Sequence, residues 1–318
     1  MLDAAPTTSV PRPPSLGALA PPRDLDVVEA VADSLDRFCK TQVDPRQNDQ
    51  RRALPAGVLD GLREMGIFGL SLPESHGGAG LSTWATGTLV SIVARRDRSL
   101  ATTLGLHLGL GTHGLVHHGS VSQRDHYLPR LATGQWLAAF ATTEPGAGSD
   151  LSALRCTLSA TGEGFALRGQ KAFVTNGGIA SLYTVAARSP GLGGARRGQS
   201  LVLVERDDAG VIVGAEEDKL GLRASSTTIV DFDDVPLGHD RVVGALGQGA
   251  DLLGDILAHG RTVMAFGCTG TAHAALAAAR THCACRVQFQ RALDQLPVVR
   301  EQLADMAAKL FTAEAVVR

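Results

Sequence analysis

The sequence Ala-Thr-Thr-Glu-Pro-Gly-Ala-Gly-Ser-Asp occupies residues 141–150, and Gln-Lys-Ala-Phe-Val-Thr-Asn-Gly-Gly occupies residues 170–178. The first run offers two adjacent hydroxyls and, at its glycines, backbone N–H groups that a ligand can approach closely. The second run adds the aromatic face of Phe173 and the hydroxyl of Thr175. Hydroxyls, uncovered N–H groups and an aromatic face suit a heterocycle that carries phosphates, so the two runs predict a flavin site.

Length and composition set the outer bounds. The chain has 318 residues, 44% hydrophobic content and a formal charge of −2, enough for a sizeable core and two or three domains. It has no Lys/Arg run interleaved with aromatic residues, which argues against nucleic acid as a partner. The apolar C-terminal stretches are broken by His, Arg and Cys, so we expect no membrane span.

The N-terminus and the cysteines bear on location. Residues 1–23 contain six prolines and no continuous apolar core, which predicts a disordered leader and no secretory signal. The five cysteines have neither an even number nor the spacing of a disulfide framework. We therefore expect a cytoplasmic protein.

The periodicity of the sequence changes twice. Residues 24–137 carry apolar side chains at three- and four-residue steps, as at Leu25, Val28 and Leu35, which predicts helices. Residues 138–248 contain short β-branched and apolar runs separated by Gly, Asp and Asn, which predicts a small antiparallel β domain. Its expected strands include residues 165–168, 171–175, 182–188, 201–205 and 228–232. Residues 249–318 return to a helical pattern. The expected order is helix, sheet, helix.

Two further runs are distinctive: Pro-Glu-Ser-His-Gly-Gly-Ala-Gly at residues 73–80 and Asp-Lys-Leu-Gly-Leu-Arg-Ala-Ser-Ser-Thr at residues 218–227. With the two runs above, they resemble the acyl-CoA dehydrogenase family, whose flavin loop reads Thr-Glu-Pro-x-Ala-Gly-Ser-Asp. The resemblance covers residues 26–318. It implies an α+β multidomain protein with an N-terminal α-helical domain, a middle antiparallel β domain and a C-terminal helical bundle, of which this sequence contains only about two helices and is therefore incomplete.

The resemblance also implies FAD as the cofactor. It makes Thr143 and Thr175 hydrogen-bond donors to the ring, Phe173 a packing partner for the ring face, and Ser149 a contact between flavin and thioester, while Arg261 matches the family's arginine at the substrate. The run that begins at Arg286 matches one through which a subunit reaches the FAD of its neighbour, although Gln290 replaces the usual glycine. The full cofactor set is Phe140, Ala141, Thr142, Thr143, Gly148, Ser149, Phe173, Val174, Thr175, Arg286, Gln288 and Phe289.

The catalytic base is unknown from the sequence. In most of the family a glutamate abstracts the α proton from a loop between late helices, and the sequence stops at Arg318 before that region. In a minority the glutamate stands just before the arginine that matches Arg261, and here that position is Gly260. His259 is the one candidate nearby, because its ordinary pKa suits a base.

The resulting interpretation is FAD-dependent α,β-dehydrogenation of an acyl thioester, carried by CoA or by an acyl-carrier protein, with electrons passed to an electron-transfer flavoprotein-like acceptor. The alternatives are a flavin-dependent monooxygenase on the same fold and a non-catalytic subunit that completes a partner's flavin site through Arg286. The unpaired apolar stripe at Leu303, Met306 and Leu310 predicts a homo- or hetero-oligomer. His113 and His117 have i, i+4 spacing but no third ligand is evident, so we expect no metal site.

Overall fold

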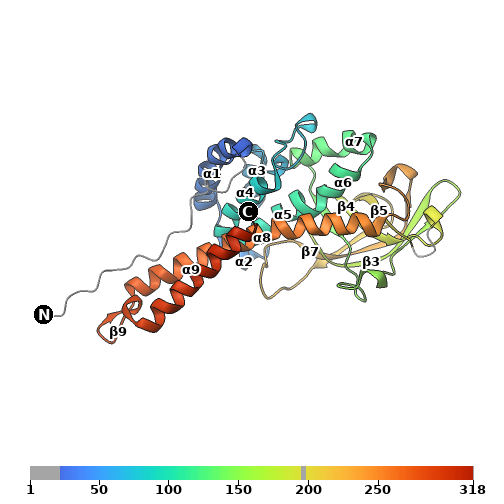
Figure 1. Cartoon of the computed structure of the whole chain (residues 1–318). Coiled ribbons are helices and arrows are strands. Elements are labelled where there is room, and N and C mark those ends of the chain that lie inside the picture. Colours follow the sequence, from blue (N-terminus) through green and yellow to red (C-terminus); the bar gives the residue numbers. More distant parts are fainter. Residues whose placement is uncertain (1–21, 195–197, 318) are drawn as a thin grey trace.

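The computed structural model describes residues 22–194 and 198–317 (Figure 1). Nearly all of the predicted leader at residues 1–23 therefore lies outside the described residues. The first helix, α1, spans Pro22–Gln42 and so begins two residues earlier than the sequence pattern indicates.

The N-terminal part of the chain is helical, as predicted. Its helices are α1, α2 (Pro45–Arg51), α3 (Ala56–Glu64), α4 (Thr83–Arg96), α5 (Arg98–Gly105), the π-helical segment η4 (Leu106–Gly111), α6 (Thr112–His118) and α7 (Val121–Ala132). Polar caps define several starts: Asp44, Ser82, Asp97 and Ser120 accept hydrogen bonds from the first-turn N–H groups of the helices that follow them. The glycine-rich run at residues 73–80 forms the turn before α4.

The middle part of the chain forms one sheet. Within the described residues its strands run in the order β6-β7-β3-β2-β4-β5-β8, with β1 beside β4. The strands are β1 (Ala138–Ala141), β2 (Thr157–Ala160), β3 (Phe165–Thr175), β4 (Leu182–Arg188), β5 (Gln199–Glu205), β6 (Val211–Glu216), β7 (Thr227–Leu237) and β8 (Val242–Val243). Most pairs are antiparallel, as predicted, whereas β1 and β2 each pair with β4 in parallel.

One strand replaces two that the sequence pattern separates. Residues 165–168 and 171–175 both belong to β3, which pairs along its length with β7. Gly169 has φ of 144°, and a Cβ there would lie 2.6 Å from the Cα of Cys156. A glycine that interrupts the apolar pattern therefore allows the strand to continue past its neighbour β2.

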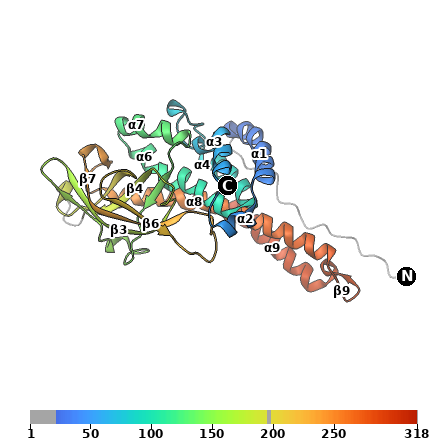
Figure 2. The same cartoon turned by 180° about the vertical axis from the view of Figure 1, so that it is seen from behind.

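Two long helices end the described chain. α8 spans Gly249–Cys285, packs on α4 and α5, and is followed by the short strands β9 (Val287–Gln288) and β10 (Arg291–Ala292). α9 (Pro297–Val317) then returns along α8. The views from both sides show the paired ends of α8 and α9 projecting beyond the rest of the molecule (Figures 1 and 2).

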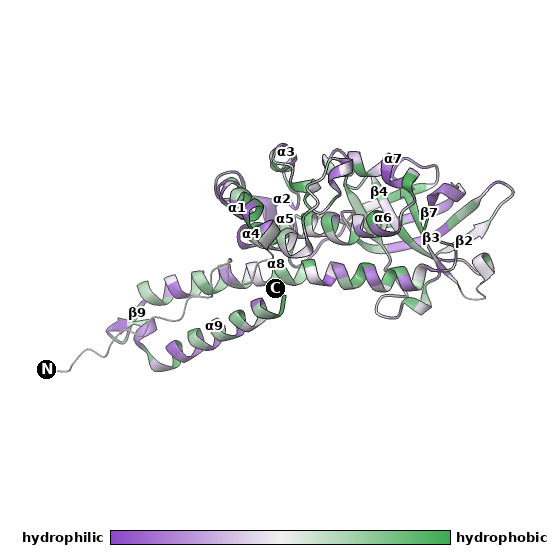
Figure 3. Cartoon of the chain, turned by 45° about the horizontal axis from the view of Figure 1, so that its top comes forward, coloured by the Kyte–Doolittle hydropathy of each residue, from purple (hydrophilic) through white to green (hydrophobic). Residues whose placement is uncertain are grey.

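Helices α8 and α9 agree only partly with two expectations from the sequence, an unpaired apolar stripe and the absence of a membrane span. Leu303 and Leu310 are buried, so the apolar stripe is not wholly unpaired, whereas Met306 is 49% exposed. Apolar residues are interspersed with polar ones along both helices (Figure 3). By length and composition α8 is also apolar enough to cross a membrane, contrary to the expectation that no stretch is.

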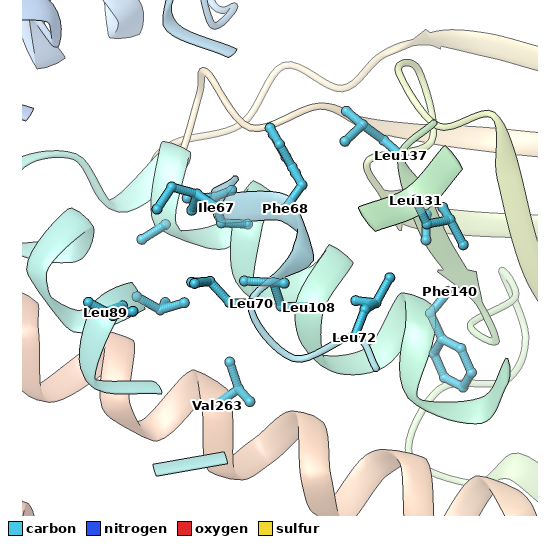
Figure 4. Packing of buried hydrophobic residues seen from close by; sticks show 14 of the residues in the cluster. Ile67, Phe68, Leu70, Leu72, Leu89, Leu108, Leu131, Leu137, Phe140 and Val263 are labelled. Carbon is cyan, nitrogen blue, oxygen red and sulfur yellow. The ribbon is translucent and has the colours of Figure 1, made fainter. Parts of the chain in front are cut away.

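The N-terminal helices and α8 share a core. The 3-10 turn at Ile67–Gly69 and the segment after it contribute Phe68, Leu70 and Leu72, all buried. Figure 4 shows Leu70 and Leu72, from the segment after this turn, gathered with Leu108 from η4 near Val263 of α8. Replacing one such leucine by alanine typically costs about 2–5 kcal/mol in the free energy of unfolding. This cluster therefore holds η4 firmly between α8 and the sheet.

Candidate flavin site

The two sequence runs that predict a flavin site lie side by side in the structure. The first continues from β1 into a loop, and the second forms the end of β3. The N–H of Ala172 donates to the carbonyl of Thr143 at 2.9 Å, which joins them. Residues 140–143 and 173–175 are therefore close enough to contact one ligand.

A buried ion pair fixes this junction. The Nζ of Lys171 lies 2.7 Å from Oε1 of Glu144 and donates to the Thr142 carbonyl at 3.0 Å. The side chains of Lys171 and Glu144 are 0% and 5% exposed. The Glu144 carboxylate also accepts from the N–H groups of Arg155 at 2.6 Å and Cys156 at 3.0 Å. These bonds satisfy both charges and attach the loop to β3 and to the start of β2.

Sequence reasoning missed this pair. Strict alternation with buried Ala172 and Val174 would place Lys171 on the exposed face of Phe173, so the pattern gave no signal for its burial. The register of β3 with β7 shifts between Lys171 and Val174, and alternation does not hold there. A fully buried lysine needs a partner, and only a carboxylate or several carbonyls can supply one.

The predicted residues differ sharply in exposure. Phe140, Ala141, Thr142 and Val174 are buried, Thr143 and Thr175 are partly exposed, and Gly148 and Ser149 are exposed. Phe173 is 64% exposed and has φ of 53°, the left-handed region that bulky residues rarely adopt. The predicted site thus combines buried residues at its base with exposed residues that a ligand can reach.

Two features of this site fit a planar heterocycle. The Thr142 hydroxyl is buried without a hydrogen-bond partner in the described part of the chain. Phe173 holds a strained backbone and presents a large apolar ring to the outside. Unpaired buried polar atoms and strained backbone are both concentrated at ligand sites. The residues present therefore fit a ring with a hydrogen-bonding edge and an apolar face.

Two buried side chains tie β1 to the helices. His107 accepts at Nδ1 from the Ala138 N–H, 3.1 Å away, so its Nε2–H donates to the Phe68 carbonyl at 3.2 Å. Burial lowers the pKa of His107 to about 4 and keeps the ring neutral. Asn176 donates from Nδ2 to the carbonyls of Thr103 and Ala138. β1 is therefore positioned by the helical domain as well as by its own sheet.

The other part of the predicted cofactor set lies far from this site. Arg286, Gln288 and Phe289 are exposed and belong to the hairpin between α8 and α9, at the projecting end of the molecule (Figures 1 and 2). Phe289 is 82% exposed. The structure of one chain does not bring these residues together with residues 140–149 and 173–175.

The residues that bear on substrate and base lie on α8. Arg261 is exposed, and His259 is partly buried. A Cβ at Gly260 would lie 2.2 Å from Cδ2 of Leu110, so any side chain there requires Leu110 to move. Burial is the main cause that lowers the pKa of His259, followed by the nearby ring of His117.

His259 opens onto a cleft of about 350 Å³, here called the histidine cleft, between the loop before α4, helix α6 and helix α8. Its walls include Ser71, Thr83, Leu108, His113, His117 and His259. Among the residues that the structure describes, no group of three or more His, Cys, Asp or Glu side chains is arranged to hold a metal ion.

Comparison with known proteins assigns the family. The model of the acyl-CoA dehydrogenase N-terminal domain matches residues 26–135, that of the middle domain residues 139–235, and that of the C-terminal domain residues 247–318. The chain belongs to the acyl-CoA dehydrogenase family. The family and the α+β multidomain fold predicted from the sequence are confirmed. The site residues stay predictions.

Individual relatives support this assignment. The very long-chain specific acyl-CoA dehydrogenase of Rattus norvegicus is 37% identical over 284 residues, which cover 87% of this chain and 43% of the relative. The chain thus spans less than half the length of this curated relative.

Among solved structures, butyryl-CoA dehydrogenase from Megasphaera elsdenii is 28% identical with a TM-score of 0.86, and the match covers 92% of this chain and 78% of that one. An acyl-CoA dehydrogenase from Bacillus anthracis, solved in complex with FAD, is 32% identical with a TM-score of 0.85, over 92% of this chain and 50% of that one.

Proposed function

We propose that this acyl-CoA dehydrogenase family member is an oxidoreductase that binds FAD and performs α,β-dehydrogenation of an acyl thioester. The observation that carries the proposal is the junction of residues 140–149 with residues 173–175, held by the Lys171–Glu144 pair. The unpaired Thr142 hydroxyl and the exposed Phe173 ring support a planar cofactor there. When bound, FAD supplies the hydride acceptor.

The chain's residues would bind and orient the reactants. Thr143 and Thr175, both partly exposed beside the junction, would donate hydrogen bonds to the ring edge. Ser149 and Arg261 are exposed and available to the thioester. The Lys171–Glu144 pair would keep the Thr142 carbonyl turned inward, away from the ligand face, because Nζ holds it at 3.0 Å.

We assign no proton acceptor beyond the candidate His259. Its partly buried ring faces the histidine cleft, and its lowered pKa leaves it neutral and able to accept a proton at pH 7. If no group in this chain serves as the base, the chain should not bleach its flavin with saturated acyl-CoA under anaerobic conditions. Bleaching that survives His259→Ala would remove His259 from consideration.

We further propose an oligomer in which Arg286, Gln288 and Phe289 contact the cofactor of a neighbouring subunit. Their exposure on a projecting hairpin supports this, because the Arg286 guanidinium is accessible and can bind a phosphate bidentately. The proposed flavin site of the same chain lies far from it, so the phosphate would belong to a neighbour's cofactor. Burial of the face around Met306 would add about 25 cal/mol for each Å² of apolar surface. Met306→Asp should therefore disperse the assembly in light scattering, and a flavin-loaded monomer indifferent to the change would contradict it.

The substrate carrier is CoA or an acyl-carrier protein, and the electron acceptor is an electron-transfer flavoprotein-like protein. We also propose that the protein is soluble and cytoplasmic, with α8 a bundle helix and not a membrane span. The support is its packing on α4, α5 and α9 within a region that matches the family's C-terminal domain.

The direct test of the proposal is cofactor binding. We expect the purified protein to be yellow, to show flavin absorbance, and to change that spectrum when an acyl-CoA is added. Absence of flavin absorbance after reconstitution with FAD would overturn the proposed function.

A further inference from the structure

Strand β3 contains an extra residue beside the proposed flavin site. Its register with β7 shifts between Lys171 and Val174. Within that shift, Ala172 and Phe173 together stand opposite the single residue Ile229. Two residues opposite one form a β-bulge, which bends the strand and re-aims a side chain. The bulge therefore explains why Phe173 is 64% exposed although the residues on both sides of it are buried.

Contacts to the loop after β1 hold this bulge in place. The N–H of Ala172 donates to the Thr143 carbonyl at 2.9 Å. The Nζ of the fully buried Lys171 lies 2.7 Å from Oε1 of Glu144. Both contacts join the residues just before Phe173 to the loop that the proposed cofactor would touch. The direction of the Phe173 side chain is therefore coupled to the geometry of that loop.

The backbone of Phe173 is strained in this arrangement. Its φ of 53° lies in the left-handed region, which is unfavourable for a residue with a large side chain and is usually occupied by Gly, Asn or Asp. Three residues later the chain has Asn176 at φ of 64°, a residue type that suits this conformation. Because the Phe173 ring is mostly exposed, packing within the chain offsets little of the strain.

A strained residue that adds little to the core needs another reason to be aromatic. Strained backbone persists where the surrounding structure fixes it, and such residues cluster at ligand sites. Glycine or asparagine at position 173 would fit the same backbone with less strain. What phenylalanine adds is a flat apolar face, which a planar ring system can cover by offset packing.

We propose that Phe173 is a strained cofactor contact, in which the bulge holds the aromatic ring against the flavin at a cost in folding stability. This inference rests on the proposed function and assigns to the bulge the positioning of one residue of that site. It requires that stability without cofactor and affinity for FAD change in opposite directions when residue 173 suits a left-handed backbone. A purely structural role for Phe173 would change both in the same direction.

Thermal unfolding of the full chain at increasing FAD concentrations measures both quantities. The midpoint extrapolated to zero FAD reports the stability of the protein itself. The rise of the midpoint with FAD concentration reports the affinity, because a ligand of the folded state stabilises that state by mass action. Fluorescence titration of FAD gives the dissociation constant independently.

Phe173→Asn removes the ring and suits the left-handed φ. We expect the midpoint without FAD to rise by about 2–4 °C, as relief of such strain allows in a protein of this size. The dissociation constant for FAD should increase about tenfold, because the variant loses ring burial and ring packing. Phe173→Leu keeps the strain and loses only the aromatic face. Its midpoint without FAD should change by less than about 1 °C, and its FAD dissociation constant should increase about threefold.

The matched control is Leu222→Asn. Leu222 has φ of 54°, is 42% exposed and lies in the loop between β6 and β7, outside the proposed site. This change should also raise the midpoint without FAD, because it relieves the same kind of strain. The FAD dissociation constant should stay within about twofold of the wild-type value.

A midpoint without FAD that falls or stays unchanged in Phe173→Asn would overturn this inference. An FAD affinity that Phe173→Asn leaves unchanged, or that Leu222→Asn lowers equally, would also overturn it. Each of these results leaves the proposed function standing, because the wild-type protein still binds FAD in the same measurements. A wild-type protein that binds no FAD, and whose midpoint does not respond to it, would overturn both.

Discussion

The predicted cofactor residues fall into two regions that differ in burial and in the number of polar contacts that hold them. The junction of β1 and β3 is built around a buried ion pair, a buried histidine and a buried asparagine, each with named partners. The hairpin between α8 and α9 presents Arg286, Gln288 and Phe289 on short exposed strands and a turn. Phe289 and Gln290 there have φ of 51° and 62°.

This difference shows which part of the site one chain can build alone. Buried polar groups that satisfy one another hold a geometry before any ligand arrives, which reduces the entropic cost of binding. Exposed side chains on a projecting hairpin acquire a fixed geometry only when something packs against them. Changes at the junction should therefore affect both folding and binding, whereas changes at the hairpin should affect binding alone.

The largest effect should come from Lys171→Met. It leaves the buried Glu144 carboxylate without its cation, and breaking a buried ion pair costs about 3–5 kcal/mol. Chemical denaturation should show this loss together with weaker FAD binding. Lys171→Met with Glu144→Leu should recover part of the stability, and Arg286→Met should change it by less than about 0.5 kcal/mol. Equal stability losses at Lys171 and Arg286 would contradict the comparison.

Acid should weaken the junction next. In the unfolded chain His107 takes up a proton below its ordinary pKa of 6.5, whereas in the fold burial keeps its pKa at about 4. The unfolded state thus binds more protons between these values, and the free energy of unfolding should fall as the pH drops from 6.5 to 4, by roughly 3 kcal/mol for this group. Urea unfolding of wild type and His107→Gln across this range measures it. A slope unchanged in His107→Gln would argue against His107.

Arg286→Gln should leave stability unchanged but weaken FAD binding, because a charge-assisted hydrogen bond to a phosphate contributes about 1.5–3 kcal/mol. The effect should appear only in the assembled protein. Fluorescence titration of FAD before and after dispersal by Met306→Asp separates the two states. Identical FAD affinity for Arg286→Gln and wild type in the assembly would make Arg286 an ordinary surface residue.

The smallest effect should come from Thr143→Val, which keeps the shape of the side chain and removes one hydroxyl. The loss should be about 0.5–1.5 kcal/mol in FAD binding and little in stability, since Thr143 is only partly buried. Thr175→Val should behave alike, and Thr157→Val on β2 is the control away from the junction. Unaltered FAD affinity in the Thr143→Val, Thr175→Val double variant would remove both from the site.

The strands and helices with strong periodicity were predictable. The segment 182–188 is β4 as expected, and the helical run from Leu25 is α1. β6 was missed, because most of its residues alternate between partial and full exposure without an apolar face. The parallel pairing of β1 with β4 was also beyond the pattern, since residue alternation is the same in either strand direction.

By itself the sequence determined the family, the helix–sheet–helix order and the two runs that predict one ligand site, because caps, glycines and apolar periodicity are local properties. Only the tertiary structure decided that Glu144 pairs with Lys171, that Asp255 orients His113, and that Arg286 stands apart from Thr143. Each of these depends on residues far apart in the chain. Their partnership is set by how sheet and helices pack, which no spacing along the sequence encodes.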